Sequence, residues 1–127
     1  MSEKNAAGNN ILPFTRVVKR PSPEEVAAIA ASDLYELLPV YDRLIGLLRE
    51  TYDYELDMLT DDIVLSVVRC REALAKGMDD KTSLKMVKEM REGLREMPKT
   101  LRALLPGLGP RLGESIEHKL GIRFSKY

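Results

Sequence analysis

The chain has 127 residues, of which 44% are hydrophobic and 31% charged, and its formal net charge at pH 7 is zero. This length and composition predict one folded domain with a single core, and they exclude a largely disordered chain. The balanced charge argues against a general polyanion binder. No apolar run approaches the ~20 residues of a membrane span, and the polar start lacks the apolar stretch of a signal peptide. We therefore expect no membrane partner. The single cysteine, Cys70, cannot form an internal disulfide, so we expect a reducing, cytoplasmic location.

The charges are unevenly distributed along the chain. Residues 33–62 carry nine acidic side chains against two arginines, a net charge of −7. Residues 91–127 carry eight basic side chains against four glutamates, a net charge of +4. This asymmetry is compatible with a basic surface near the C-terminus, or with electrostatic attraction between the two regions.

Residues 1–21 predict a flexible N-terminal arm in front of a single α-helical domain at 22–127. The first ten positions are mainly small or polar. The segment 11–20, ILPFTRVVKR, then joins a short apolar patch to three basic residues, and Pro21 closes it. This segment is either a disordered tail or a docking segment that orders on a partner or on the domain itself.

Helix signals begin at Ser22, a suitable N-cap, with Pro23 at the first helical position and two glutamates behind it. Asp33 and Glu36 form a second candidate capping box. One apolar stripe with steps of three and four follows: Leu34, Leu37, Leu38, Tyr41, Leu44, Ile45, Leu48 and Tyr52. Pro39 lies inside this stripe, so the helix either kinks there or begins just before it.

Two further stripes have helical spacing. The first ends at Gly77, a suitable C-cap, and consists of Leu56, Leu59, Ile63, Val67, Cys70 and Leu74. A turn follows, with Asp79 or Asp80 as the next N-cap. The second stripe consists of Leu84, Val87, Met90, Leu94, Met97, Leu101 and Leu104, and Pro98 within it can start a separate short helix. We expect five residues of these stripes to be buried on facing helices, with Cys70 inert beside them: Leu44, Ile63, Val67, Val87 and Leu94.

The final predicted helix is 110–120, ended by Gly121, with residues 122–127 as a short tail. No segment alternates with period two for long enough to form a sheet. We therefore expect an all-α fold, a small bundle of four to five helices with a flexible N-terminal arm. Methionines such as Met86, Met90 and Met97 are most simply core residues, although they also suit an adaptable partner groove.

The stretch 104–116, LLPGLGPRLGESI, carries the strongest functional signal. Gly107 and Gly109 can adopt backbone angles that other residues avoid, and without side chains they allow a close approach. Clustered N–H groups at such a hairpin and at the start of the next helix bind anions, phosphate above all. We expect Leu108 to point inward and hold the two helices together. Three nearby residues would add positive charge: Lys99, Arg102 and Arg111.

This stretch resembles the helix-hairpin-helix motif of DNA-binding and DNA-repair proteins over about residues 98–122. The matching positions are Leu101, Leu104, Pro106, Gly107, Leu108, Gly109, Gly113 and Ile116, and KLGI after them is similar to the usual exit of the motif. The resemblance implies contact with a nucleic-acid backbone through the hairpin amides, without sequence preference, sometimes with a bound monovalent cation. Alternatively, the glycines only end one helix and turn the chain into the next.

Four acidic residues recur at steps of three and four: Glu50, Asp53, Asp57 and Asp61. A continuous helix would place them on one face, where they suit a basic protein partner better than a metal ion. Without a histidine or a second acidic pair nearby, we expect no metal site there. His118 has no evident nucleophile to serve, so we predict no enzymatic activity and no cofactor. Two hypotheses remain. The protein binds nucleic acid through the 106–113 hairpin, or it is a helical adaptor or inhibitor that binds a protein through its acidic face or its N-terminal arm.

Overall fold

The computed structural model describes residues 20–51 and 53–127. In these residues the chain forms five α-helices, two short 3-10 helices and no strand, which confirms the predicted all-α fold. The elements are α1 (Pro23–Arg49), η2 (Tyr54–Leu56), α2 (Asp57–Lys76), α3 (Asp80–Arg95), α4 (Met97–Leu104), α5 (Gly109–Leu120) and η3 (Phe124–Lys126). The predicted arm lies outside the described residues, apart from Arg20 and Pro21.

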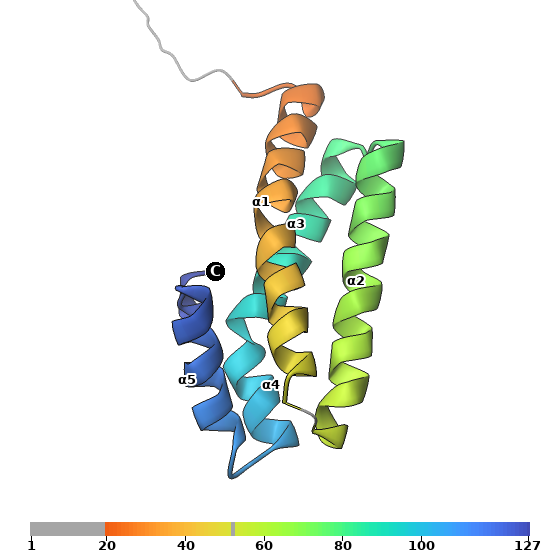
Figure 1. Ribbon diagram of the computed structural model, residues 1–127. Helices are drawn as coiled ribbons and strands as arrows, with labels where there is room; N and C mark the ends of the chain where they lie inside the picture. The colour runs from red at the N-terminus through yellow and green to blue at the C-terminus, as the bar shows by residue number, and fades with distance from the viewer. Residues whose placement is uncertain (1–19, 52) are drawn as a thin grey trace, which may run out of the picture.

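Helix α1 is the central element of the bundle (Figure 1). Helices α2, α3 and α5 pack against it, and α4 pairs with α5 at the end of the molecule opposite the start of α1. None of the described helices combines the length and apolar character needed to cross a membrane.

The start of α1 is the one predicted from Ser22. The Glu25 N–H donates to the Ser22 side-chain oxygen at 3.1 Å, and the Ser22 N–H donates to the Glu25 carboxylate at 2.8 Å, a complete capping box. The alternative start before Pro39 is wrong, because the helix runs through that residue. Asp33 is not a cap; its carboxylate lies 3.5 Å from the Arg91 guanidinium and links the acidic region to the basic one.

The core lies between α1 and the helices around it. The five residues expected to be buried on facing helices are buried, with at most 7% of their surface exposed, and Cys70 beside them is fully buried. Every described member of the α1 stripe is buried, whereas Tyr52 lies outside the described residues. Leu84 belongs to the predicted apolar stripe but is not a core residue, because 53% of its surface is exposed. One turn before Val87 the core position is taken by Ser83, whose hydroxyl is satisfied by donating to the Asp79 carbonyl at 2.7 Å.

The predicted helix ends around the α2–α3 connection are confirmed. Gly77 is the C-cap of α2, which ends at Lys76. Its φ is +84°, a backbone angle that glycine adopts easily and that is costly for other residues. Asp79 caps α3, and its side chain accepts a hydrogen bond from the Thr82 N–H at 2.8 Å. The stripe through Pro98 is divided as predicted, since α4 is a separate helix with Pro98 in its first turn.

Residues 122–127 are more than a tail, which corrects the sequence-based expectation. Phe124 is fully buried, and its N–H donates to the Glu117 carboxylate at 2.8 Å. The Arg95 guanidinium donates to the Tyr127 carbonyl at 3.2 Å, so η3 is held against α3. Six residues are too few to show a helical period, and for this reason the sequence pattern did not reveal the burial of Phe124.

Candidate nucleic-acid interface

Helices α4 and α5 form a helical hairpin in which α5 returns beside α4 (Figure 1). Gly109 lies where the two helices meet, and it is buried. A Cβ atom at this position would lie 2.5 Å from the carbonyl carbon of Leu101 and 2.9 Å from the backbone nitrogen of Arg102. The close approach of α4 and α5 therefore requires a residue without a side chain at position 109.

The conformational role expected of the hairpin glycines is wrong. Among the described glycines only Gly77 and Gly121 have positive φ, so Gly107 and Gly109 adopt backbone angles that other residues share. A Cβ atom at Gly107 would meet nothing within 4 Å, and one at Gly113 would lie 3.7 Å from the Leu101 side chain, an ordinary contact. Of these three glycines, only Gly109 is required by packing.

Leu108 does not point inward as expected; 47% of its surface is exposed at the tip of the hairpin. The space between α4 and α5 is already filled by Leu101 and Ile116, which are 0% and 2% exposed. Leu108 is therefore an apolar group on the surface, directly next to the backbone of the hairpin.

Three N–H groups of the hairpin, those of Gly107, Leu108 and Arg111, donate no hydrogen bond to any described atom. Their neighbours are engaged: the Gly109 N–H donates to the Leu105 carbonyl at 2.6 Å, and the Leu112 N–H donates to the Leu108 carbonyl at 2.9 Å. The unpaired groups lie at the N-terminal end of α5, where the helix dipole favours negative charge. They are the donors that a bound anion would use.

The three basic residues expected near the hairpin differ in their surroundings. Arg111 is exposed in the first turn of α5, and Arg102 is exposed on the last turn of α4. Neither forms an ion pair with a carboxylate in the described part of the chain. Lys99 instead lines a groove that α4 shares with the start of α2, beside Met58.

Comparison of the chain with protein-family models, curated proteins and solved structures gave no match. The resemblance of residues 98–122 to the helix-hairpin-helix motif therefore stays a prediction from the sequence. The structure itself gives three local features of the hairpin: the close helix contact at Gly109, the unpaired N–H groups and the two exposed arginines.

The acidic residues expected on one helix face are not on one helix, so this expectation is wrong. Helix α1 ends at Arg49 and leaves Glu50 as its C-cap, while Asp53 is the N-cap of η2. Only Asp57 and Asp61 share a helix, one turn apart on α2, and both are exposed. The chain reverses direction between α1 and α2, which the spacing of the acidic residues does not reveal. The described residues contain no group of three His, Cys, Asp or Glu side chains placed to hold a metal ion.

Cys70 and His118 are far apart in the bundle. Cys70 is fully buried on α2, and this burial raises the pKa of its thiol, which disfavours the reactive thiolate. His118 is exposed on α5, which lies on the other side of α1 from α2. The two side chains therefore do not form a Cys–His pair.

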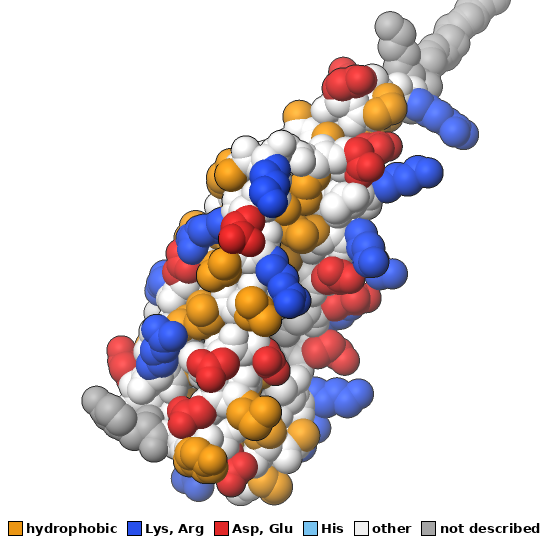
Figure 2. All heavy atoms as spheres, turned by 90° about the vertical axis from the view of Figure 1, so that its right-hand side faces the viewer, with side chains coloured by type: hydrophobic (Ala, Val, Ile, Leu, Met, Phe, Trp, Pro, Cys, Tyr) orange, Lys and Arg blue, Asp and Glu red, His pale blue; other side chains and the backbone are white. Residues whose placement is uncertain are grey.

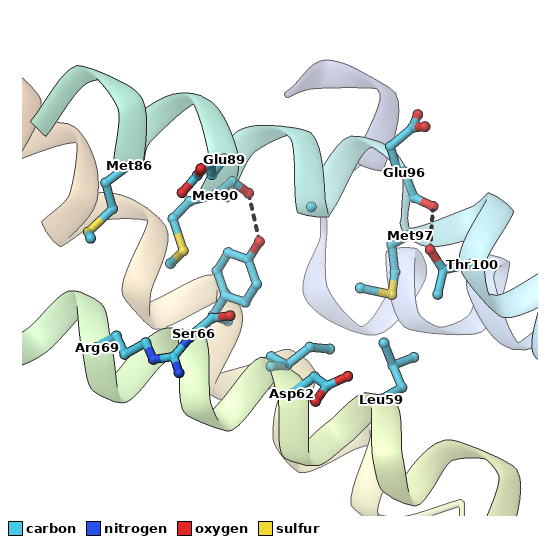
Figure 3. Close-up of a pocket in the computed structure, with 13 residues that line it drawn as sticks. Leu59, Asp62, Ser66, Arg69, Met86, Glu89, Met90, Glu96, Met97 and Thr100 are labelled. Carbon is cyan, nitrogen blue, oxygen red and sulfur yellow. Dashed lines mark hydrogen bonds between the residues drawn. The ribbon is translucent and has the colours of Figure 1, made fainter. Parts of the chain in front are cut away.

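A groove between α2 and α3 was not located from the sequence (Figure 3). Both helices pack mainly on α1, and the groove of about 340 Å³ between them contains Met86, Met90 and Met97. Its floor includes Tyr41 of α1, and its edges carry charged side chains from both helices. The methionines were the only sequence feature that pointed to a groove. Their helical spacing predicted a core position equally well.

Proposed function

We propose that this protein is a non-enzymatic nucleic-acid-binding protein that holds the phosphate backbone at the α4–α5 hairpin without sequence preference. The observation that carries the proposal is the set of three N–H groups, on Gly107, Leu108 and Arg111, that donate to no described atom. Phosphate oxygens are strong acceptors, and clustered N–H groups at a helix N-terminus bind them readily. We place this activity in the cytoplasm, because a single cysteine fits a reducing compartment.

Arg111 and Arg102 flank these donors and supply positive charge. Backbone N–H groups and arginines of this kind contact phosphate and sugar rather than base edges. We therefore expect binding without sequence preference. Two neutralised phosphates correspond to a slope of roughly −2 in log affinity against log salt. Affinity for duplex DNA then falls about tenfold between ~50 mM and ~200 mM salt.

The matched variants Leu108→Glu and Leu108→Gln test this proposal. Leu108 is exposed, so both polar side chains fit without disturbing the core. Glutamate places a negative charge beside the N–H groups and repels phosphate, whereas glutamine has a similar shape and no charge. We expect Leu108→Glu to abolish binding to a fluorescent DNA duplex at ~50 mM salt and Leu108→Gln to retain it.

Arg111→Ala provides a second measurement on the same duplexes. It should weaken binding to all sequences alike and make the salt slope less steep by about one unit. Two results would overturn the proposal: no binding by the unmodified protein at ~50 mM salt, or equal binding by Leu108→Glu and Leu108→Gln.

A protein partner at the start of α2 is the second candidate function. Tyr54 and Met58 are 84% and 78% exposed there, next to the carboxylates of Asp57 and Glu55. Figure 2 shows acidic and hydrophobic side chains together on the lower part of this face. A basic partner with an apolar anchor fits such a surface. Purification of complexes from the native host, with Met58→Asp as the comparison, would detect a partner that depends on this surface.

A further inference from the structure

Helix α2 is packed on one side only. Among the helices its main contact is with α1, and four of its 20 residues are buried. Its opposite face carries Met58, Leu65 and Val68, whose surfaces are 78%, 46% and 44% exposed. Steps of seven and three residues place these side chains on one stripe along the helix. Figure 2 shows this side of the molecule, with hydrophobic side chains along its length. Helix α2 therefore presents an apolar stripe that no other described helix covers.

The charges of α2 are divided between its two halves. Residues 57–66 carry three acidic side chains and no basic one, whereas residues 67–76 carry three basic side chains and one glutamate. Arg71 is already paired with Asp42 of α1, at 2.6 Å. Asp62 and Arg69 are exposed, and neither forms an ion pair within the described part of the chain. The outer side of α2 thus carries unpaired charges of opposite sign in its two halves.

Two copies of α2 complement each other when they run in opposite directions. Asp62 and Arg69 lie on either side of Leu65, about 4.5 Å and about 6 Å from it along the helix. Because they are seven residues apart, they lie on the same side of α2, at the edge of the α2–α3 groove (Figure 3). A two-fold axis beside Leu65 therefore brings Asp62 of one copy level with Arg69 of the other. A parallel pair would place like charges together, which is unfavourable.

We propose that two copies of this chain form an antiparallel homodimer through the exposed face of α2. Leu65 lies at the two-fold axis, and two ion pairs flank it, each between Asp62 of one copy and Arg69 of the other. One pair of helices buries less surface than a standard interface of ~1,600 Å², so we expect a weak dimer in exchange with the monomer. This inference is independent of nucleic-acid binding at the hairpin, and it needs no host protein, unlike the second candidate function.

Sedimentation equilibrium of the purified full-length protein tests the proposal. The average mass at ~0.5 mM protein should lie well above the monomer mass and fall to it on dilution to ~5 μM. Leu65→Lys places two positive charges at the axis and should give a monomer at both concentrations. Ile29→Lys is the matched control, because Ile29 is 59% exposed on α1, and it should leave the association unchanged. A monomeric unmodified protein at ~0.5 mM, or equal association of the two lysine variants, would overturn the proposal.

Charge-reversal variants test the antiparallel pairing directly. Asp62→Arg alone places two positive charges opposite each other across the interface, and Arg69→Asp alone places two negative charges there, so each variant should be monomeric. Both positions are exposed, so both variants should keep the fold. In an equal mixture the two variants carry complementary faces and should form a heterodimer. A mixture that stays monomeric, or single variants that associate as strongly as the unmodified protein, would show that Asp62 and Arg69 do not pair between copies.

Discussion

The hydroxyl of Tyr41 in α1 donates a hydrogen bond to the backbone carbonyl of Met90 in α3, at 2.7 Å. The hydroxyl is buried, and Gly93 on the next turn of α3 leaves the space that it occupies. A Cβ atom at position 93 would lie 2.5 Å from the tyrosine oxygen. This bond therefore fixes how α3 lies on α1, and it forms part of the floor of the α2–α3 groove.

The Tyr41 hydroxyl predicts a loss of stability at alkaline pH. Burial, and then the charge of Cys70, raise its pKa from 10.0 to about 12. Because the folded-state pKa is the higher one, the stabilisation is complete below pH ~10 and is lost as pH rises through ~12. Between about pH 9 and pH 12, urea unfolding should show the unmodified protein losing about 2–3 kcal/mol more than Tyr41→Phe. Equal losses would mean that the hydroxyl ionises freely in the folded protein.

Gly109 and Gly113 should respond in opposite directions to alanine. At position 109 the new methyl group would collide with the backbone of Leu101, so Gly109→Ala should destabilise the protein by about 1–3 kcal/mol. At position 113 the contact is an ordinary 3.7 Å, and alanine should stabilise α5 by up to about 1 kcal/mol. Thermal and urea unfolding of the two variants would check this. A stable Gly109→Ala variant would contradict the close contact between α4 and α5.

Leu94 should be far more sensitive to truncation than Leu84 on the same helix. Leu94 is fully buried, so Leu94→Ala should cost about 2–5 kcal/mol through lost contacts and a cavity. Leu84 is 53% exposed, and Leu84→Ala should change the free energy of unfolding by no more than about 0.5 kcal/mol. Urea melts of both variants measure the difference. Similar losses of unfolding free energy in the two variants would contradict the orientation of α3, which places Leu94 in the core and Leu84 at the surface.

Phe124 should stabilise the whole bundle although it lies near the end of the chain. Its side chain is fully buried, and Phe124→Ala should cost about 3–5 kcal/mol. The neighbouring Ser125 is exposed, so Ser125→Ala serves as the control and should be nearly neutral. Guanidinium unfolding would measure both. A small effect of Phe124→Ala would show that η3 detaches from α3 at little cost.

The sequence by itself determined the helices, because their signals are local. The Ser22 capping box and the Asp79 cap involve partners three residues away, and the Gly77 end depends on the φ of one residue. The apolar stripe of α1 depends only on helical period. The glycine hairpin was found in the same way, as a short pattern of consecutive residues. Pro39 remained ambiguous, since a proline inside a helix is decided by the packing on both sides of it.

Only the tertiary structure decided which of these residues meet. Gly109 is required because α4 and α5 approach each other at that residue, and the same contact leaves Leu108 outside. Lys99 lines a groove that α4 shares with the start of α2, and the acidic residues separate because the chain turns after Arg49. The groove exists because α2 and α3 both pack on α1 more than on each other. Each of these depends on contacts between residues distant in sequence, which neither period nor capping specifies.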